Sequence, residues 1–232
     1  MSQNSSNLQL PPKSGEESGL EQLLHHAKIW RAGETSPTQG IPTDSSVLDS
    51  LLPNHGWPPG SLTEILTEQE GIGALRLVLP AVARLTQTQW VVWVCPPYVP
   101  YAPALQAAGV VLERMLIVEP DEDQQADTEY MLWVFEQALR FVDCGVAMAW
   151  IGAAQHVRLR RLQLACEQGQ TWGVMFRPES FAIQPSPAAL RLSLVADAGT
   201  GVEVRILKSQ GGSKARSCRV DLSSSNKVKI KC

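Results

Sequence analysis

The sequence predicts an α/β domain built on a mainly parallel sheet that is flanked by helices. Short apolar runs alternate with segments of helical periodicity between residues 62 and 207. The runs at 90–95 and 145–151 are apolar without interruption, as expected of parallel strands that are covered on both faces. Strands and helices that alternate through short connections favour a parallel sheet, and this order determines the predicted class.

The expected elements follow from local periodicity. In chain order they are a strand at 62–66, a helix at 74–86, a strand at 90–95, a short helix at 103–108, a strand at 115–118, a helix whose inner face is Leu132, Phe135, Leu139 and Val142, a strand at 145–151, a helix at 157–167 and a strand at 171–176. Pro80 lies inside the helix at 74–86 and predicts a kink or a late helix start. Residues 190–195 and 202–207 predict a C-terminal antiparallel hairpin.

The ends of the chain differ in composition from its centre. Residues 1–17 are rich in Ser, Gln and Pro and are expected to be disordered. Residues 18–42 predict a helix and a linker, with capping-box spacing between Ser18 and Glu21. The core is expected at 43–208, and 209–232 is expected to be a basic tail. The cations of this tail are Lys214, Arg216, Arg219, Lys227, Lys229 and Lys231.

Bulk composition excludes several classes of protein. With 232 residues, 44% of them hydrophobic and 19% charged, the chain is long enough for one globular core. The formal net charge of -3 argues against coating nucleic acid by bulk electrostatics. The polar N-terminus and short apolar runs predict a cytoplasmic protein without a membrane partner. Five scattered cysteines without a CxxC pair favour reduced core thiols over a metal site or disulfides.

Residues 42–77 carry a resemblance to the RecA nucleotide-binding core. That family has a Thr-Gly-x-x-x-Leu-Asp run, then a Gly-Leu-Pro-x-Gly turn, a strand and a phosphate loop. The matching residues here are Thr43, Leu48, Asp49, Gly56, Trp57, Pro58, Gly60 and Glu64. The order of elements downstream also fits, so the resemblance covers roughly residues 18–212 and implies a RecA-like core.

The phosphate loop that the resemblance implies is degenerate. A working loop needs Lys to neutralise phosphate charge and a hydroxyl to hold Mg²⁺, whereas the aligned residues here are Ala74 and Leu75. Two carboxylates also stand where phosphate would bind and would repel it. The degenerate loop comprises Thr67, Glu68, Glu70, Gly71, Gly73, Ala74 and Leu75. Taken alone, its EGIG sequence favours an ordinary strand-to-helix turn; its place behind the turn at Gly56–Gly60 is what favours a phosphate loop.

Two further catalytic positions of the RecA family are vacated. The general-base position aligns with Pro97, and the Walker-B position aligns with Trp150. Proline cannot accept a proton from water, and an indole N–H cannot coordinate Mg²⁺. The sequence also contains no recognisable nucleophile motif. We therefore expect a pseudo-ATPase without catalytic residues, metal or cofactor.

More narrowly, the tracts LTEILTEQEGIGALRL, PPYVPYAPAL, LRRLQLA and WGVMFRP resemble the ImuA family. This resemblance implies a non-catalytic adaptor in translesion DNA synthesis within the bacterial SOS response to DNA damage. The implied partners are an ImuB-like Y-family polymerase homologue, an error-prone replicative-type polymerase and RecA. The alternative is a SulA-like inhibitor of cell division that binds FtsZ, and a true RecA-type ATPase is a third class.

Three surfaces are candidates for partner binding. One face of the helix expected at 18–32 could pack on a RecA-like partner or on the chain's own core; it comprises Leu20, Leu23, Leu24, Ala27, Ile29 and Trp30. Arg158, Arg160 and Arg161 could contact DNA phosphates, although three arginines on a helix also suit a solvated face. The basic tail could contact DNA or an acidic partner, or have no specific partner.

Overall fold

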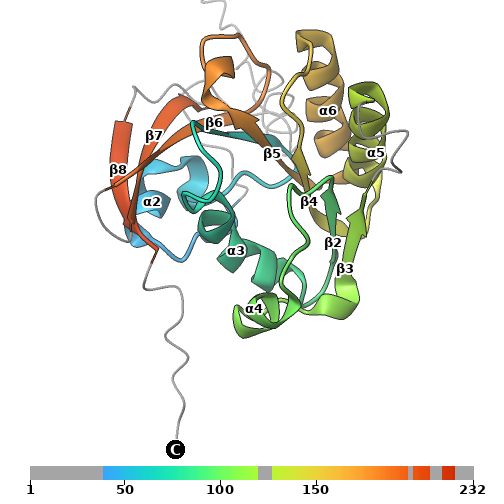
Figure 1. Cartoon of the computed structure of the whole chain (residues 1–232), viewed down its shortest axis with the longest axis horizontal. Coiled ribbons are helices and arrows are strands. Elements are labelled where there is room, and N and C mark those ends of the chain that lie inside the picture. Colours follow the sequence, from blue (N-terminus) through green and yellow to red (C-terminus); the bar gives the residue numbers. More distant parts are fainter. Residues whose placement is uncertain (1–38, 120–126, 198–200, 210–215, 223–232) are drawn as a thin grey trace, which may run out of the picture. The chain divides into compact units, whose positions relative to one another are not determined.

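An eight-stranded sheet organises residues 39–119, 127–197, 201–209 and 216–222, the parts of the chain that the computed structural model describes (Figure 1). Its strands are β1 (Leu62–Thr67), β2 (Trp90–Val94), β3 (Met115–Val118), β4 (Cys144–Trp150), β5 (Trp172–Pro178), β6 (Leu190–Ala196), β7 (Gly201–Ser209) and β8 (Arg216–Asp221). They lie in the order β3-β2-β4-β5-β1-β6-β7-β8. The first six strands, β1 to β6, pair with one another only in parallel. Strand β7 pairs antiparallel with β6 on one side and with β8 on the other. The predicted parallel sheet with a C-terminal hairpin is confirmed.

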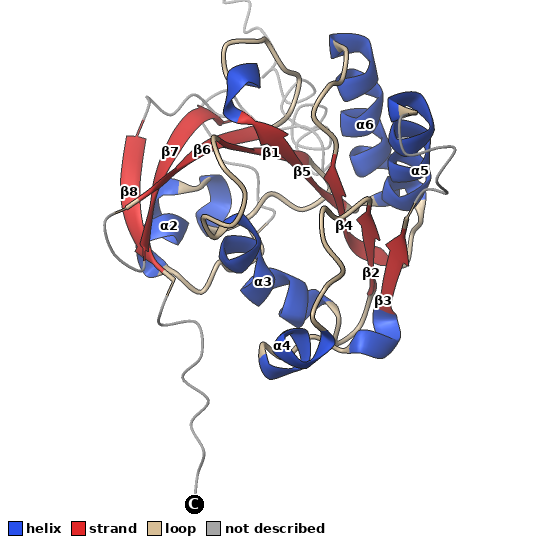
Figure 2. Cartoon of the chain, in the orientation of Figure 1, coloured by secondary structure: helices blue, strands red, loops and turns tan. Residues whose placement is uncertain are grey.

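Helices cover both faces of the sheet (Figure 2). They are α2 (Ser46–Leu51), α3 (Ala74–Leu85), α4 (Ala102–Ala107), α5 (Thr128–Arg140) and α6 (His156–Gly169). The apolar sides of α2, α3 and α4 share one core, and those of α5 and α6 share a second core across the sheet. Among the described residues, no helix has the length and apolar character that crossing a bilayer requires.

Two local predictions need correction. The sheet continues past residue 208, because β8 adds a strand to β7 within the segment expected to be only a basic tail. Val202, Val220 and Leu222 are buried in the first core, which explains why this segment pairs with the sheet. Val142 was expected on the inner face of a helix, but α5 ends at Arg140 and the Val142 side chain is 76% exposed.

Two further local predictions can be compared with the structure. The predicted helix at 74–86 is confirmed as α3, but it starts at Ala74 and continues through Pro80, so the late start suggested by Pro80 does not occur. The four described cysteines are free thiols, and Cys144 and Cys166 are buried in the second core. Burial raises the pKa of the Cys144 thiol to about 12, consistent with an unreactive core cysteine.

The segment before β1 is held by local hydrogen bonds and close packing. The Thr43 amide donates to Asp49 Oδ1 at 3.0 Å, which ties the start of the segment to α2. Trp57 is fully buried and stacks on Trp172 of β5 with ring centroids 5.2 Å apart. This arrangement places β1 in the sheet with its carboxyl end pointing to the degenerate phosphate loop.

Candidate functional site

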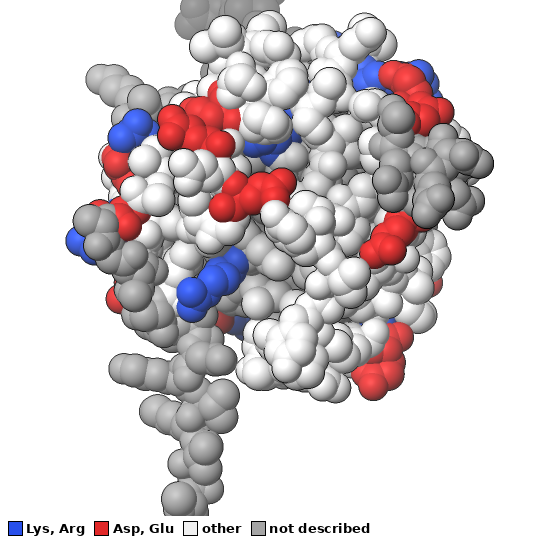
Figure 3. Space-filling model, viewed as in Figure 1, with Lys and Arg blue, Asp and Glu red and all other residues white. Residues whose placement is uncertain are grey.

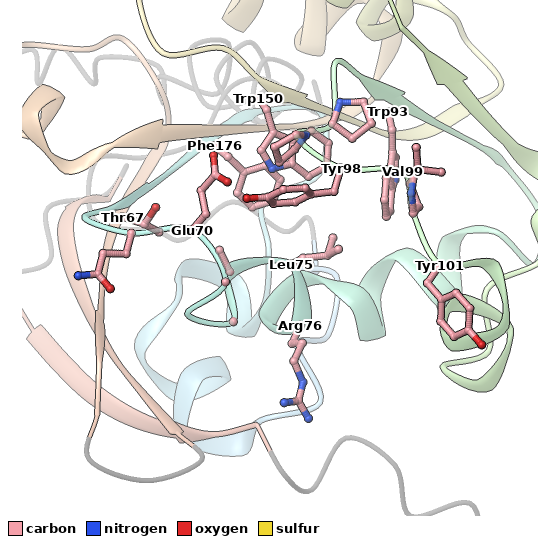
Figure 4. A pocket seen from close by; sticks show the side chains of 17 residues that line it. Thr67, Glu70, Leu75, Arg76, Trp93, Tyr98, Val99, Tyr101, Trp150 and Phe176 are labelled. Atoms are coloured by element: carbon pink, nitrogen blue, oxygen red, sulfur yellow. The ribbon is translucent and has the colours of Figure 1, made fainter.

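A pocket of about 360 Å³ opens at the carboxyl ends of β1, β2, β4 and β5. Ligands of open α/β sheets bind at this edge, outside the carboxyl ends of the strands. The lining combines the loop between β1 and α3, the loop after β2, and aromatic side chains of the sheet (Figure 4). Its position and its concave shape make it the candidate functional site.

The degenerate phosphate loop forms one wall of the pocket. The residues of the predicted loop that line it are Thr67, Glu70, Gly71, Gly73, Ala74 and Leu75, whereas Glu68 is exposed beside it. Gly71 and Gly73 have φ values of 79° and 108°, a left-handed conformation that glycine adopts without the penalty of a side chain. The segment therefore forms a strand–turn–helix, in which Ala74 and Leu75 occupy the positions predicted for the Lys and hydroxyl residues of a phosphate loop.

Both vacated catalytic positions reach the same pocket. Pro97 lies in the loop after β2 and Trp150 ends β4, and both line the pocket together with the degenerate loop. Figure 4 shows Trp150 across the pocket from Leu75. The three replacements predicted from distant parts of the sequence are thus assembled at one place in the structure.

Aromatic side chains form the floor of the pocket. Trp93 and Trp150 have ring centroids 5.5 Å apart at an interplanar angle of 56°. Trp150 and Phe176 stack at 4.7 Å and 21°. The three rings come from β2, β4 and β5, whose parallel pairing brings them into one row. Sequence reasoning missed Trp93 and Phe176, although large aromatic residues near the carboxyl ends of apolar strands were the available signal.

The rim of the pocket is exposed and partly acidic. Tyr98, Val99 and Tyr101 are 72%, 84% and 72% exposed, although they belong to residue types that usually pack. The Tyr98 hydroxyl donates to the Glu70 carboxylate, and this hydrogen bond together with the negative charge of Glu70 raises the pKa of Tyr98. Arg76 also lines the pocket and donates from Nη2 to the Leu222 carbonyl at 2.8 Å.

The arginines expected to meet DNA are mostly engaged within the protein. Arg158 pairs with Glu129 of α5, and Arg161 pairs at 3.0 Å with Glu136, which is buried. Arg160 is exposed on α6. The pairs join α6 to α5, and their acidic partners reduce the positive charge available to a phosphate backbone.

The remaining candidates fall in two groups. Arg216 and Arg219 lie on β8, where Arg219 Nε contacts Asp197 Oδ2 at 2.5 Å. The others lie outside the described residues: Leu20, Leu23, Leu24, Ala27, Ile29, Trp30, Lys214, Lys227, Lys229 and Lys231.

Sequence comparisons find similar proteins for the part of the chain that contains most of the pocket lining. The family model described as the cell division inhibitor SulA matches residues 60–173, which include β1, the degenerate loop and Trp150. Protein ImuA of Caulobacter vibrioides (strain NA1000 / CB15N) is 28% identical over 150 residues, or 62% of this chain. Part of the chain is similar to the ImuA and SulA proteins. The predicted resemblance to ImuA, with a relationship to SulA, is confirmed.

The likeness covers only part of each relative. The matched region spans 59% of the Caulobacter ImuA. The cell division inhibitor SulA of Edwardsiella piscicida is 26% identical over 107 residues, which cover 45% of this chain and 61% of that protein. The crystal structure of SulA from Pseudomonas aeruginosa aligns at 22% identity and a TM-score of 0.42, over 52% of this chain and 99% of the other.

Proposed function

We propose that this chain is a non-catalytic, RecA-like adaptor in SOS-induced translesion DNA synthesis. The relationship to ImuA supports this role, and the strand–loop–helix at β1 and α3 supports a scaffold derived from a phosphate-loop ATPase. The proposed partners are an ImuB-like Y-family polymerase homologue, an error-prone replicative-type polymerase, RecA and DNA.

The observation that carries the non-catalytic part is the convergence of Ala74, Leu75, Pro97 and Trp150 on one pocket. Phosphoryl transfer depends on cationic and metal groups that neutralise charge and on a base that orients the nucleophile. None of these four side chains supplies a positive charge, a metal ligand or a proton acceptor. Glu70 adds negative charge at the position of the phosphates.

Two measurements test the adaptor. Purified protein should show no Mg²⁺-dependent ATP hydrolysis above the no-protein rate, and it should co-purify with an ImuB-like protein encoded beside it. ATP turnover that is lost on mutating a residue of the degenerate loop would contradict the proposal. Failure to bind the ImuB-like protein would remove the adaptor role.

A second candidate function is inhibition of cell division. The SulA family model matches 60–173, and this observation favours a SulA-like protein that binds FtsZ and blocks its polymerisation. Sedimentation of FtsZ polymers with and without the chain distinguishes the two functions. A stoichiometric decrease in pelleted FtsZ supports the inhibitor, and unchanged sedimentation supports the adaptor.

A further inference from the structure

The described chain ends at the wall of the pocket. A Cβ on Gly73 would overlap the Leu222 side chain, so Leu222 packs directly on the degenerate loop. The Leu222 carbonyl accepts the 2.8 Å hydrogen bond from Arg76. Both Gly73 and Arg76 line the pocket, so Leu222, the last described residue, lies at its wall.

The pocket offers two kinds of contact to an occupant. Its aromatic floor can contact apolar side chains, and the faces of Trp and Tyr rings attract cations. Glu68 and Glu70 place two carboxylates on the loop that forms one wall, both exposed. The face of the molecule seen in Figure 3 is otherwise largely uncharged, with scattered acidic and basic groups. A matching occupant would combine apolar and basic side chains.

The sequence that follows Leu222 has this composition. Residues 223–232 read SSSNKVKIKC, in which three lysines alternate with Val228 and Ile230 and no acidic residue occurs. Ten extended residues reach roughly 33 Å, which is enough to cross a pocket of this size. Attachment to the pocket wall also gives the segment a high effective concentration at the site.

We propose that residues 223–232 bind back into the aromatic pocket, with Val228 and Ile230 against its floor and the lysines facing Glu68 and Glu70. The bound segment covers the exposed Tyr98, Val99 and Tyr101. This inference does not depend on which proposed function is correct.

Cys232 provides a native probe for the test in the full chain. Val99→Cys introduces a thiol at the rim, at a side chain that is 84% exposed, and oxidised glutathione promotes disulfide formation. Ile183→Cys, at a side chain that is 93% exposed and outside the pocket lining, is the matched control. Peptide mass spectrometry identifies the disulfide, and non-reducing gels separate bonds within one molecule from bonds between two.

We expect the Val99→Cys chain to form an internal disulfide with Cys232 at least about tenfold faster than the Ile183→Cys chain, because binding in the pocket gives Cys232 a higher effective concentration at the rim than at residue 183. Adding Glu68→Gln and Glu70→Gln, or 1 M salt, should remove most of the difference because the attraction is screened or absent. Equal rates at the two positions, bonds mainly between molecules, or rates unaffected by removing the carboxylates would each overturn the proposal.

Discussion

Glu64 is a fully buried carboxylate held between two guanidinium groups. Its Oε1 lies 3.0 Å from Arg177 Nη1 and its Oε2 lies 2.6 Å from Arg191 Nε. Ser186 donates a third hydrogen bond at 2.9 Å. Arg191 in turn donates to carbonyls of the segment between β5 and β6, including Gln184 at 2.9 Å. The resemblance singled out Glu64 as a family residue, and its contacts here are structural.

Glu64→Gln should therefore lower the free energy of unfolding by about 3–5 kcal/mol, because it leaves two buried guanidinium groups without their counter-charge. Glu113→Gln, at an exposed position, is the control and should change stability by less than about 0.5 kcal/mol. Urea unfolding followed by circular dichroism measures both. A loss below about 1 kcal/mol for Glu64→Gln would show that the arginines find other partners.

Tyr98 and Glu70 give a second prediction for single residues. Glu70 raises the pKa of Tyr98 because its carboxylate accepts a hydrogen bond from the neutral hydroxyl and its negative charge disfavours the phenolate. The chain has only three tyrosines, so the rise in phenolate absorbance with pH contains the titrations of three groups. Glu70→Gln should shift one titration to lower pH, and Glu113→Gln should shift none. Identical curves for both variants would show that the hydrogen bond does not form in solution.

At the scale of elements, Leu222, which directly follows β8, packs on the degenerate loop. Gly71 and Gly73 both have positive φ, but a Cβ at residue 71 meets open space and a Cβ at residue 73 meets Leu222. Substitutions at the two glycines therefore distinguish the cost of backbone strain from the cost of a clash with Leu222.

Gly71→Ala should cost about 1 kcal/mol through its left-handed backbone alone. Gly73→Ala should cost at least about 1 kcal/mol more, because Leu222 must move. In a double-mutant cycle, Leu222→Ala should recover part of that extra loss, as expected for residues in contact. Strictly additive effects in urea unfolding would mean that Leu222 does not pack on the loop.

At the scale of the whole molecule, the vacated catalytic positions come from three separate segments that the sheet assembles. Ala74→Lys with Leu75→Thr restores the two missing side chains of the loop. ATP hydrolysis should nevertheless stay at the background rate, because Pro97 and Trp150 still supply neither base nor metal ligand. Release of phosphate from ATP in the presence of Mg²⁺ measures this. Measurable turnover by the double variant would show that other residues supply the base and the metal ligand.

The sequence by itself determined the α/β class and the order of the elements, and it predicted the three vacated positions. These follow from local periodicity and from short motifs, which need no knowledge of distant contacts. It also predicted the relationship to ImuA and SulA. The segment around β8 was missed because its strand pattern is short and its cationic composition resembles a solvated tail.

Only the tertiary structure decided what those positions form together. The parallel pairing of β2, β4 and β5 aligns Trp93, Trp150 and Phe176 into one aromatic row beside the degenerate loop. The packing of α6 against α5 also pairs Arg158 and Arg161 with acidic residues of α5, which no sequence spacing indicated. The physical reason is that a pocket and an ion pair depend on register and packing between segments far apart in the chain. The sequence gives the identity of each side chain, but it does not show which distant side chains the folded sheet places in contact with it.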